Sequence, residues 1–243
     1  FVEAFERKFA DFVGVKHAIG TNTGTGALIM ALKAAGVRPG DEVITVPNTF
    51  IATIGAIVAA GARPVFVDSD QRYQIDANQI EDAIGPKTKA VLPVHWAGCP
   101  CDIEAIVEIA ERKGVVVVED ACPSVGARVG ERHVGTFGRA SGISMHPLKP
   151  LNVWGDGGIV ITDDDEVNDY LRLYRNHGLV DRDHVSMWGI NDRLQPFQAV
   201  VGARVLDLVE DEVAKRIANA RQLDEGLREL GEFIHIPERP AGV

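Results

Sequence analysis

The sequence predicts an α/β protein, a three-layer sandwich in which helices cover both faces of a mostly parallel seven-stranded sheet. Three observations predict this class. Short apolar runs alternate with helical patterns along the chain. Several runs are continuously apolar, such as residues 115–118, and this is typical of strands buried on both faces of a sheet. No Pro- or Ser-rich linker divides the 243 residues, a length that suits one large domain with an extension.

Seven short apolar runs are expected to be the strands, and most are followed by turn residues. They are residues 17–20, 42–46, 64–68, 90–94, 115–119, 142–145 and 158–162. Sheets of this kind bind ligands at the carboxyl ends of their strands. The residues that follow these runs are therefore the first candidates for a functional site.

Helical patterns fill the segments between the predicted strands. One apolar stripe at helical spacing opens the chain, formed by Phe1, Phe5, Phe9 and Phe12. Residues 27–35 are apolar nearly all round, which predicts a buried helix. Helices are also expected from Asp76 to Gly85, from Asp102 to Gly114 and after the acidic turn 163–165, because Asp favours helix starts and Gly favours helix ends. Residues 194–230 form a charged helical pattern with one possible break.

The composition excludes several classes of partner. Lys and Arg total 25 against 35 Asp and Glu, a net charge of −10, which disfavours binding to nucleic acid and to anionic membranes. Three cysteines cannot form a disulfide framework, and neither a signal segment nor an apolar run of transmembrane length is present. These features favour a cytoplasmic protein. Both ends of the sequence interrupt a pattern, which suggests a segment of a longer protein.

Several common site motifs do not match. The loop 20–26 has neither the glycine spacing of a dinucleotide site nor the Gly-Lys-Ser/Thr of a P-loop. His95, Cys99 and Cys101 lie close together, but two cysteines one residue apart suit tetrahedral zinc poorly, and no second cluster completes the ligand set. We therefore expect these three residues to be structural and predict no metal site.

Two candidate features follow predicted strands early and midway along the chain. The loop 20–26 opens a helix, so its free N–H groups and the helix dipole would hold an anion such as a phosphate, although Gly and Thr there could equally be plain capping residues. Asp120 ends the most apolar run. It could pair with a protonated ring nitrogen, or it could simply cap a turn.

Two further candidates supply an amine and an aromatic ring. Lys149 leaves a buried strand just before the glycine-rich run 155–158, so it is a candidate amine nucleophile, or else an ordinary surface lysine. Phe50 follows the second predicted strand. It could stack on a planar cofactor or pack in the core. A phosphate cradle, a ring-nitrogen carboxylate, a stacking ring and a lysine together predict a pyridoxal phosphate (PLP) site.

With these residues in place, the chain resembles the DegT/DnrJ/StrS family of PLP-dependent sugar aminotransferases, which have the fold-type-I architecture. The resemblance covers essentially the whole chain. It rests on the sequences GTGAL at 24–28, PGDEVI at 39–44, TF at 49–50, PVFVD at 64–68, PVH at 93–95, EDA at 119–121, Lys149 with GDGG at 155–158, RNHG at 175–178, and NDRL at 191–194 with QA at 198–199.

The resemblance implies the role of each site residue. Lys149 would form the Schiff base with PLP, and Asp120 would pair with the pyridinium nitrogen. Phe50 would lie against the ring. The phosphate would be held by Gly24, Thr25 and Ser144 of the same chain and by Asn191 of a neighbouring subunit, which implies a homodimer with shared active sites.

The resemblance also implies the reaction and the domain plan. An amino-acid donor, glutamate or glutamine, would give its amino group to the cofactor, which would then aminate a nucleotide-linked keto-sugar. Residues 1–193 would form the PLP-binding large domain, and residues 194–243 would be connecting helices leading to a C-terminal small domain absent from this chain. Two departures from the family pattern are Pro123, where Gln or His is usual, and Pro150, where Asn is common.

Two other functions compete with amino transfer. A PLP-dependent sugar dehydratase of the same family would carry another residue, typically His, in place of Lys149. A catalytically silent binding or regulatory protein on this fold would be expected to lack Lys149 or Asp120. Both residues are present, so both alternatives are disfavoured.

Overall fold

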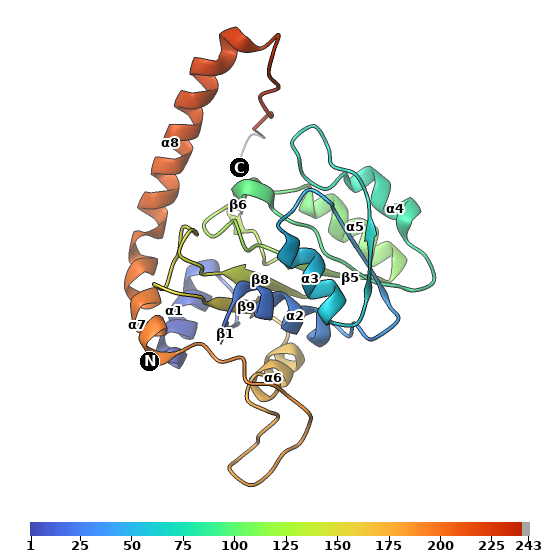
Figure 1. Ribbon diagram of the computed structural model, residues 1–243, viewed down its shortest axis with the longest axis vertical. Helices are drawn as coiled ribbons and strands as arrows, with labels where there is room; N and C mark the ends of the chain where they lie inside the picture. The colour runs from blue at the N-terminus through green and yellow to red at the C-terminus, as the bar shows by residue number, and fades with distance from the viewer. Residues whose placement is uncertain (240–243) are drawn as a thin grey trace.

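The computed structural model describes residues 1–239 and places a seven-stranded sheet at the centre of the molecule (Figure 1). Across the sheet the strand order is β1-β9-β8-β5-β4-β2-β3. Strand β9 is antiparallel to both of its neighbours, whereas the other six strands run in one direction. The strands are β1 (His17–Thr21), β2 (Glu42–Thr45), β3 (Arg63–Phe66), β4 (Thr88–Val91), β5 (Val116–Asp120), β8 (Ala140–Ser144) and β9 (Gly158–Thr162). The predicted mostly parallel sheet is confirmed.

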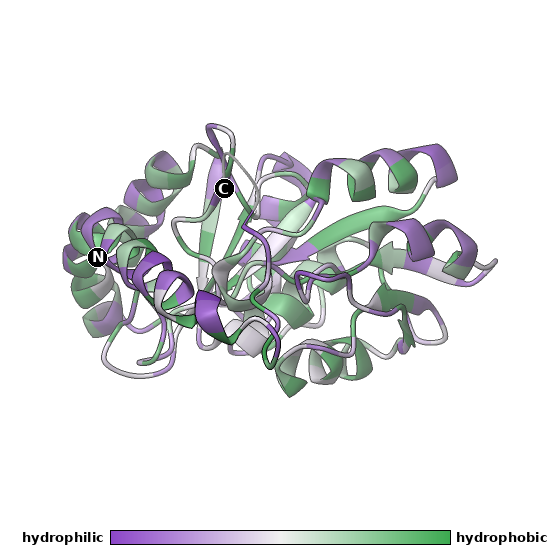
Figure 2. Ribbon diagram, turned by 90° about the horizontal axis from the view of Figure 1, so that it is seen from above, coloured by the Kyte–Doolittle hydropathy of each residue, from purple (hydrophilic) through white to green (hydrophobic). Residues whose placement is uncertain are grey.

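Helices cover both faces of this sheet, so the predicted three layers are confirmed. One face buries α2 (Gly24–Ala34), α3 (Ile51–Ala59) and α6 (Asp165–Tyr174). The opposite face buries α1 (Val2–Val13), α4 (Ile80–Ala83), α5 (Ile103–Lys113) and α7 (Pro196–Val205). Figure 2 shows largely apolar strands between helices that carry both polar and apolar residues. A small hairpin of β6 (Arg128–Val129) and β7 (Arg132–His133) follows β5.

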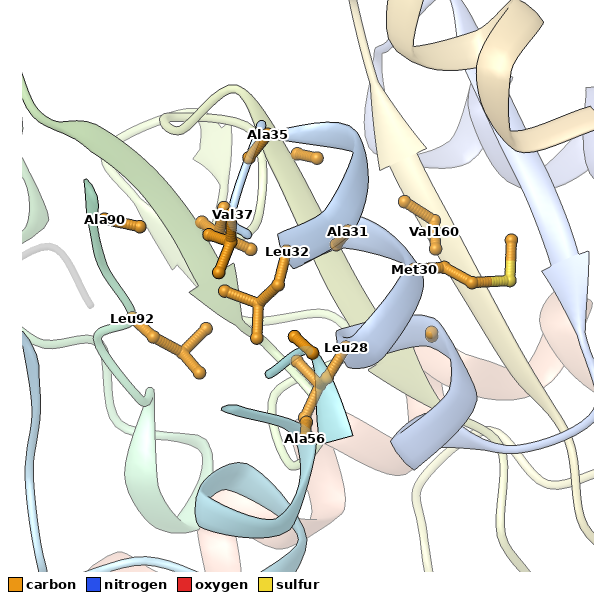
Figure 3. Close-up of a cluster of buried hydrophobic side chains, with 14 of the residues drawn as sticks. Leu28, Met30, Ala31, Leu32, Ala35, Val37, Ala56, Ala90, Leu92 and Val160 are labelled. Atoms are coloured by element: carbon orange, nitrogen blue, oxygen red, sulfur yellow. The ribbon is translucent and has the colours of Figure 1, made fainter. Parts of the chain in front are cut away.

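Helix α2 is the central element of the larger core cluster, as its nearly all-apolar sequence predicts. Leu28 and Leu32 lie between the sheet and Ala56 of α3, and Met30 lies towards Val160 of β9 (Figure 3). The helix approaches β8 at Gly142, where an added Cβ would lie 2.7 Å from Leu28 Cδ2. Glycine at this position therefore leaves room for α2 to pack closely against β8.

Three details of the predicted helices are wrong. Phe1 is 84% exposed and precedes α1, so it does not belong to the apolar stripe, in which Phe5 and Phe9 are buried. The helix expected from Asp76 to Gly85 is a 3-10 turn, Ala77–Gln79, followed by the single turn of α4. Helix α3 was not expected, because its sequence is apolar without a clear period and such runs do not distinguish helix from strand.

The predicted helix starts at Asp102 and after the acidic turn are confirmed. Asp102 accepts a hydrogen bond from the N–H of Ala105, and α5 ends at Gly114 in the left-handed conformation. Asp164 caps α6 by accepting from the N–H groups of Glu166 and Val167. Both caps work because a short carboxylate satisfies donors that the first turn leaves free.

The C-terminal helical pattern has the break that the sequence suggested. A 3-10 turn, Leu206–Leu208, separates α7 from α8 (Val209–Leu227), and another, Arg228–Leu230, follows α8. Helix α8 projects away from the sheet along one side of the molecule (Figure 1). Residues 240–243 of the predicted extension lie outside the described residues. Within residues 1–239, no helix combines the length and apolarity that crossing a membrane requires.

Candidate active site

A pocket of about 370 Å³ lies at the carboxyl ends of β5 and β8, beside the first turns of α2 and α3. Asp120 and Ser144 are the last residues of β5 and β8, Gly24 is the first residue of α2, and Phe50 immediately precedes α3. Six of the seven predicted site residues line it, namely Gly24, Thr25, Phe50, Asp120, Ser144 and Lys149. The sheet order brings them together from distant positions in the sequence.

The loop before α2 leaves two backbone donors free beside a hydroxyl group. Thr23 caps the helix through its side chain, which accepts from the N–H of Gly26 at 2.8 Å. Within residues 1–239, the N–H groups of Gly24 and Thr25 donate to no other atom. A Cβ added to Gly24 would lie 2.5 Å from Ser144 Cβ, so glycine is what allows this turn to approach Ser144. Free N–H groups at a helix start form a cradle suited to a phosphate.

The Asp120 carboxylate is buried and held through both oxygens. Thr53 Oγ1 donates to Oδ2 at 2.7 Å, and the Cys122 N–H donates to Oδ1 at 3.1 Å. The backbone of Asp120 is fixed by hydrogen bonds to Pro93 O at 2.9 Å and from the His95 N–H at 3.1 Å. A carboxylate has about four acceptor positions, so Asp120 keeps the capacity to bind a protonated nitrogen in the pocket.

The neighbouring Glu119 serves a different, structural purpose. Its buried carboxylate accepts from the N–H groups of Gly135, Phe137 and Gly138, and it lies 3.0 Å from His95 Nε2. His95 Nδ1 in turn accepts from the N–H of Cys101 at 3.3 Å. Both ring nitrogens of His95 are therefore engaged by protein groups. The expectation that His95 and Cys101 are structural agrees with these contacts.

Lys149 and Phe50, the predicted amine and the predicted stacking ring, both line the pocket. Lys149 is half-buried on the turn after β8, and within the described chain its ammonium group makes no hydrogen bond or ion pair. Phe50 is 67% exposed, so the alternative of core packing is wrong for this ring.

Burial, together with the Asp120 carboxylate, raises the pKa of the Cys122 thiol well above its ordinary value. Cys122 is therefore held as the neutral thiol.

Asn191 is the one predicted site residue that lies outside this pocket. It is exposed, and its backbone forms an isolated antiparallel bridge with Asn176. Asn191 does not cap the following helix, because α7 begins after Gln195. The adjacent Asp192 is buried and accepts from the N–H of Asn22 at 3.1 Å, which ties this segment to the loop before α2. The expected contact of Asn191 with a neighbouring subunit stays a prediction.

Sequence reasoning missed several residues of the pocket. Thr49, Thr53, Trp96 and Cys122 all line it, and Thr53 is the direct partner of Asp120. Thr49 precedes α3 and Thr53 lies in its first turn, so no helical spacing in the sequence links the two side chains. Pro123 also lines the pocket and, as expected, offers it no side-chain donor.

Comparisons with known proteins agree with this geometry. Residues 1–242 match the model of the DegT/DnrJ/EryC1/StrS aminotransferase family. The chain is 46% identical over 202 residues to a pleiotropic regulatory protein of Geobacillus stearothermophilus, covering 83% of this chain and 54% of that protein. It is 42% identical over 231 residues to the dTDP-3-amino-3,4,6-trideoxy-alpha-D-glucose transaminase of Micromonospora megalomicea subsp. nigra, covering 94% of this chain and 62% of the transaminase.

A solved structure shares the fold across nearly all of the chain. The crystal structure of NtdA from Bacillus subtilis, with bound cofactor PMP, aligns with a TM-score of 0.91 at 32% identity. The alignment covers 98% of this chain and 55% of that one. The chain thus spans between about half and two thirds of the length of the relatives it matches.

Proposed function

Because the chain belongs to the DegT/DnrJ/EryC1/StrS aminotransferase family, we propose that it forms the PLP-binding part of a sugar transaminase. The amino donor is glutamate or glutamine, and the acceptor is a keto-sugar, most simply a nucleotide-linked one. The observation that carries the proposal is the convergence on one pocket of Lys149, the buried Asp120 and the open loop at Gly24. The relative at 42% identity, named as a dTDP-sugar transaminase, supports the substrate class.

The pocket residues fit PLP. The free N–H groups of Gly24 and Thr25, with the Ser144 hydroxyl, would hold the phosphate. Phe50 would lie against one face of the ring, and Asp120 would bind the ring nitrogen in its protonated form. Lys149 would provide the amine for covalent attachment. A pocket of about 370 Å³ offers room for a pyridine ring with its phosphate.

Each residue then has a separate task in the reaction. PLP, when bound, supplies a ring that accepts an electron pair from the substrate carbon. Asp120 holds the proton on the ring nitrogen, because an ionised carboxylate stabilises a positive partner. Lys149 Nζ would serve as the acid–base group of the reaction, taking the proton from the donor α-carbon and later giving it back. In the second half, the same nitrogen moves a proton in the reverse direction on the sugar.

We also propose that two chains share each site, with Asn191 of one contacting the cofactor phosphate of the other. Exposed apolar side chains around the pocket support a subunit interface on this side. Phe50 and Leu148 both line the pocket and are 67% and 82% exposed, and Ile51, next to Phe50, is 70% exposed. Apolar groups exposed close together commonly mark an interface.

The regulatory name of the relative at 46% identity raises the alternative of a protein that binds PLP or sugar without turnover. A dehydratase is the other alternative. A dehydratase would dispense with an amine at position 149, and a silent protein would need no more than one of Lys149 and Asp120. Both residues line the pocket, and Lys149 is unpaired among the described residues. Amino transfer is the function that uses all of these groups.

Covalent attachment of PLP to Lys149 tests this proposal. The full-length protein, incubated with PLP and reduced with borohydride, should lose its visible absorption band and carry the cofactor on Lys149 in peptide mass spectrometry. Lys149→Ala should lack the band, whereas Lys113→Ala, which removes a lysine paired with Glu81 on the far side of the sheet, should retain it. Attachment at Lys33 or Lys113 instead would reject the assignment.

Transfer itself is then measured with glutamate or glutamine and a panel of nucleotide-linked keto-sugars. Formation of an amino-sugar product, with loss of the donor amino group, is the expected result. A protein that binds PLP at Lys149 but converts no member of the panel and no free keto-sugar would favour the silent alternative.

A further inference from the structure

Thr53 is a buried hydroxyl residue to which neither the family resemblance nor the sequence pattern gives a role. It lies in the first turn of α3, is 1% exposed, and places Oγ1 2.7 Å from Asp120 Oδ2. The same oxygen lies 2.8 Å from Thr49 Oγ1. A threonine in a helix commonly bonds to a carbonyl oxygen of the preceding turn. Thr53 instead directs its hydroxyl out of the helix, to a strand end 67 residues away in sequence.

The direction of these two hydrogen bonds follows from the chemistry of the carboxylate. An ionised carboxylate only accepts, so the Thr53 hydroxyl must donate to Asp120. Its single proton is then used, and Thr49 must donate to the Thr53 oxygen. The result is a one-way chain from Thr49 through Thr53 to Asp120, and such chains strengthen each bond through mutual polarisation.

We propose that Thr53 is a positioning residue, which fixes the Asp120 carboxylate relative to the Phe50 ring. The start of α3 would then set two contacts to a planar cofactor ring, one made by Phe50 and one made by Asp120. Phe50 lies at the start of α3, and Thr53 lies three residues later on the same helix. The other Asp120 oxygen is fixed by the backbone of its own strand end, at the Cys122 N–H. Thr53 therefore supplies the side-chain bond that orients the carboxylate towards a ring held beneath Phe50. This role rests on the proposed function, in which Asp120 pairs with the ring nitrogen of PLP.

The experiment removes the hydroxyl group and keeps the shape of the side chain. Thr53→Val is nearly isosteric, whereas Thr53→Ser retains the hydroxyl. The matched control is Thr45→Val, because Thr45 is also fully buried and donates at 2.8 Å, but to the backbone oxygen of Leu92 outside the pocket. For each full-length variant we would measure the melting temperature without cofactor, the PLP dissociation constant, the absorption spectrum of bound PLP from pH 5 to 9, and the rate of the glutamate half-reaction.

Thr53→Val and Thr45→Val should lose similar stability, since each loses one buried hydrogen bond. Only Thr53→Val should shift the pH dependence of the PLP spectrum, in the same direction as Asp120→Asn, and slow the half-reaction about tenfold at saturating donor, the scale of one hydrogen bond to a charged group. Thr53→Ser should restore both. If Thr53→Val does not fold, Thr49→Val tests the same chain from its outer end, with a smaller shift expected.

The possible results separate this inference from the proposed function. Absence of a PLP band in the wild-type protein would reject the proposed function itself. If Asp120→Asn alters the spectrum but Thr53→Val behaves like Thr45→Val, then Asp120 acts without Thr53 and the positioning role is wrong. A spectral shift in Thr53→Val that Thr53→Ser fails to correct would also contradict it, because the hydroxyl would then not be the cause.

Discussion

At the scale of single residues, the buried His133 couples the stability of this protein to pH. The ring lies on β7, 3% exposed, with its centroid 5.0 Å from that of Phe12, and Nε2 has no partner among the described residues. Burial, and secondarily the positive charge of Arg128, lowers the pKa of His133 from 6.5 to about 4. Water solvates the charged ring in the unfolded chain, whereas the folded interior does not.

The sign of the stability change follows from which state binds the proton. Between pH 6.5 and about 4 the unfolded chain protonates His133 and the folded chain does not, so the free energy of unfolding is highest above pH 6.5 and falls as the pH drops towards 4. A shift of this size corresponds to at most about 3 kcal/mol. In urea denaturation from pH 8 to 4, His133→Leu should lose less stability on acidification than the wild type. His235→Gln, a change at an exposed histidine, should lose as much unfolding free energy between pH 8 and 4 as the wild type does. An equal loss in the wild type and both variants would contradict the prediction.

At the scale of elements, the start of α2 depends on how closely it approaches β8. In Gly24→Ala, the new Cβ would lie 2.5 Å from Ser144 Cβ and 3.0 Å from its Cα, so either the helix or the strand end must shift. Because the free N–H groups of this turn and the Ser144 hydroxyl are proposed to share the phosphate, PLP should bind at least about tenfold more weakly. The loss of stability should be about 1–3 kcal/mol, the usual cost of overpacking.

Gly226→Ala is the matched control for that substitution. Gly226 lies on the exposed helix α8, and an added Cβ there would meet nothing within 4 Å. This variant should bind PLP as the wild type does and gain up to about 1 kcal/mol from helix propensity. PLP titration by absorbance and thermal melting measure both quantities. An unchanged PLP affinity in Gly24→Ala would mean that the phosphate lies elsewhere.

At the scale of the whole molecule, the exposed position of Asn191 makes subunit sharing testable by mixing. Lys149→Ala and Asn191→Ala subunits should each be inactive alone. If each site takes Lys149 from one chain and Asn191 from the other, a mixed dimer contains one intact site, since a two-fold interface repeats the same contact twice. Exchange of the two variants should therefore restore up to half of the wild-type activity per mixed dimer.

Native mass spectrometry of differently tagged subunits would establish that mixed dimers form. Full activity of Asn191→Ala alone, or mixed dimers without activity, would reject the shared site. In either case Asn191 would act only through its backbone bridge to Asn176, which is the contact it makes within its own chain.

Local patterns in the sequence were sufficient to predict the strands, most of the helices and most of the candidate site. The alternation of apolar runs with caps such as Asp102 and Asp164 depends only on neighbouring residues, so it is legible in a linear sequence. The residues at strand ends could be found in the same way, since the carboxyl ends of parallel strands meet at one edge. That is why Asp120 and Lys149 could be grouped from local patterns, whereas the role of Ser144 came from the family resemblance.

The strand order, the helical state of α3 and the partners of the site residues depend instead on tertiary packing. A nine-residue helix that is apolar nearly all round has no period to distinguish it from a buried strand, so packing against α2 and β3 settles its conformation. Thr53 and Asp120 are 67 residues apart, and their hydrogen bond depends on where two elements meet rather than on either local sequence. Whether a side chain is buried or exposed also depends on tertiary packing. Phe1 and Phe50 look like core residues in the sequence, and both are exposed because no element of the described chain covers them.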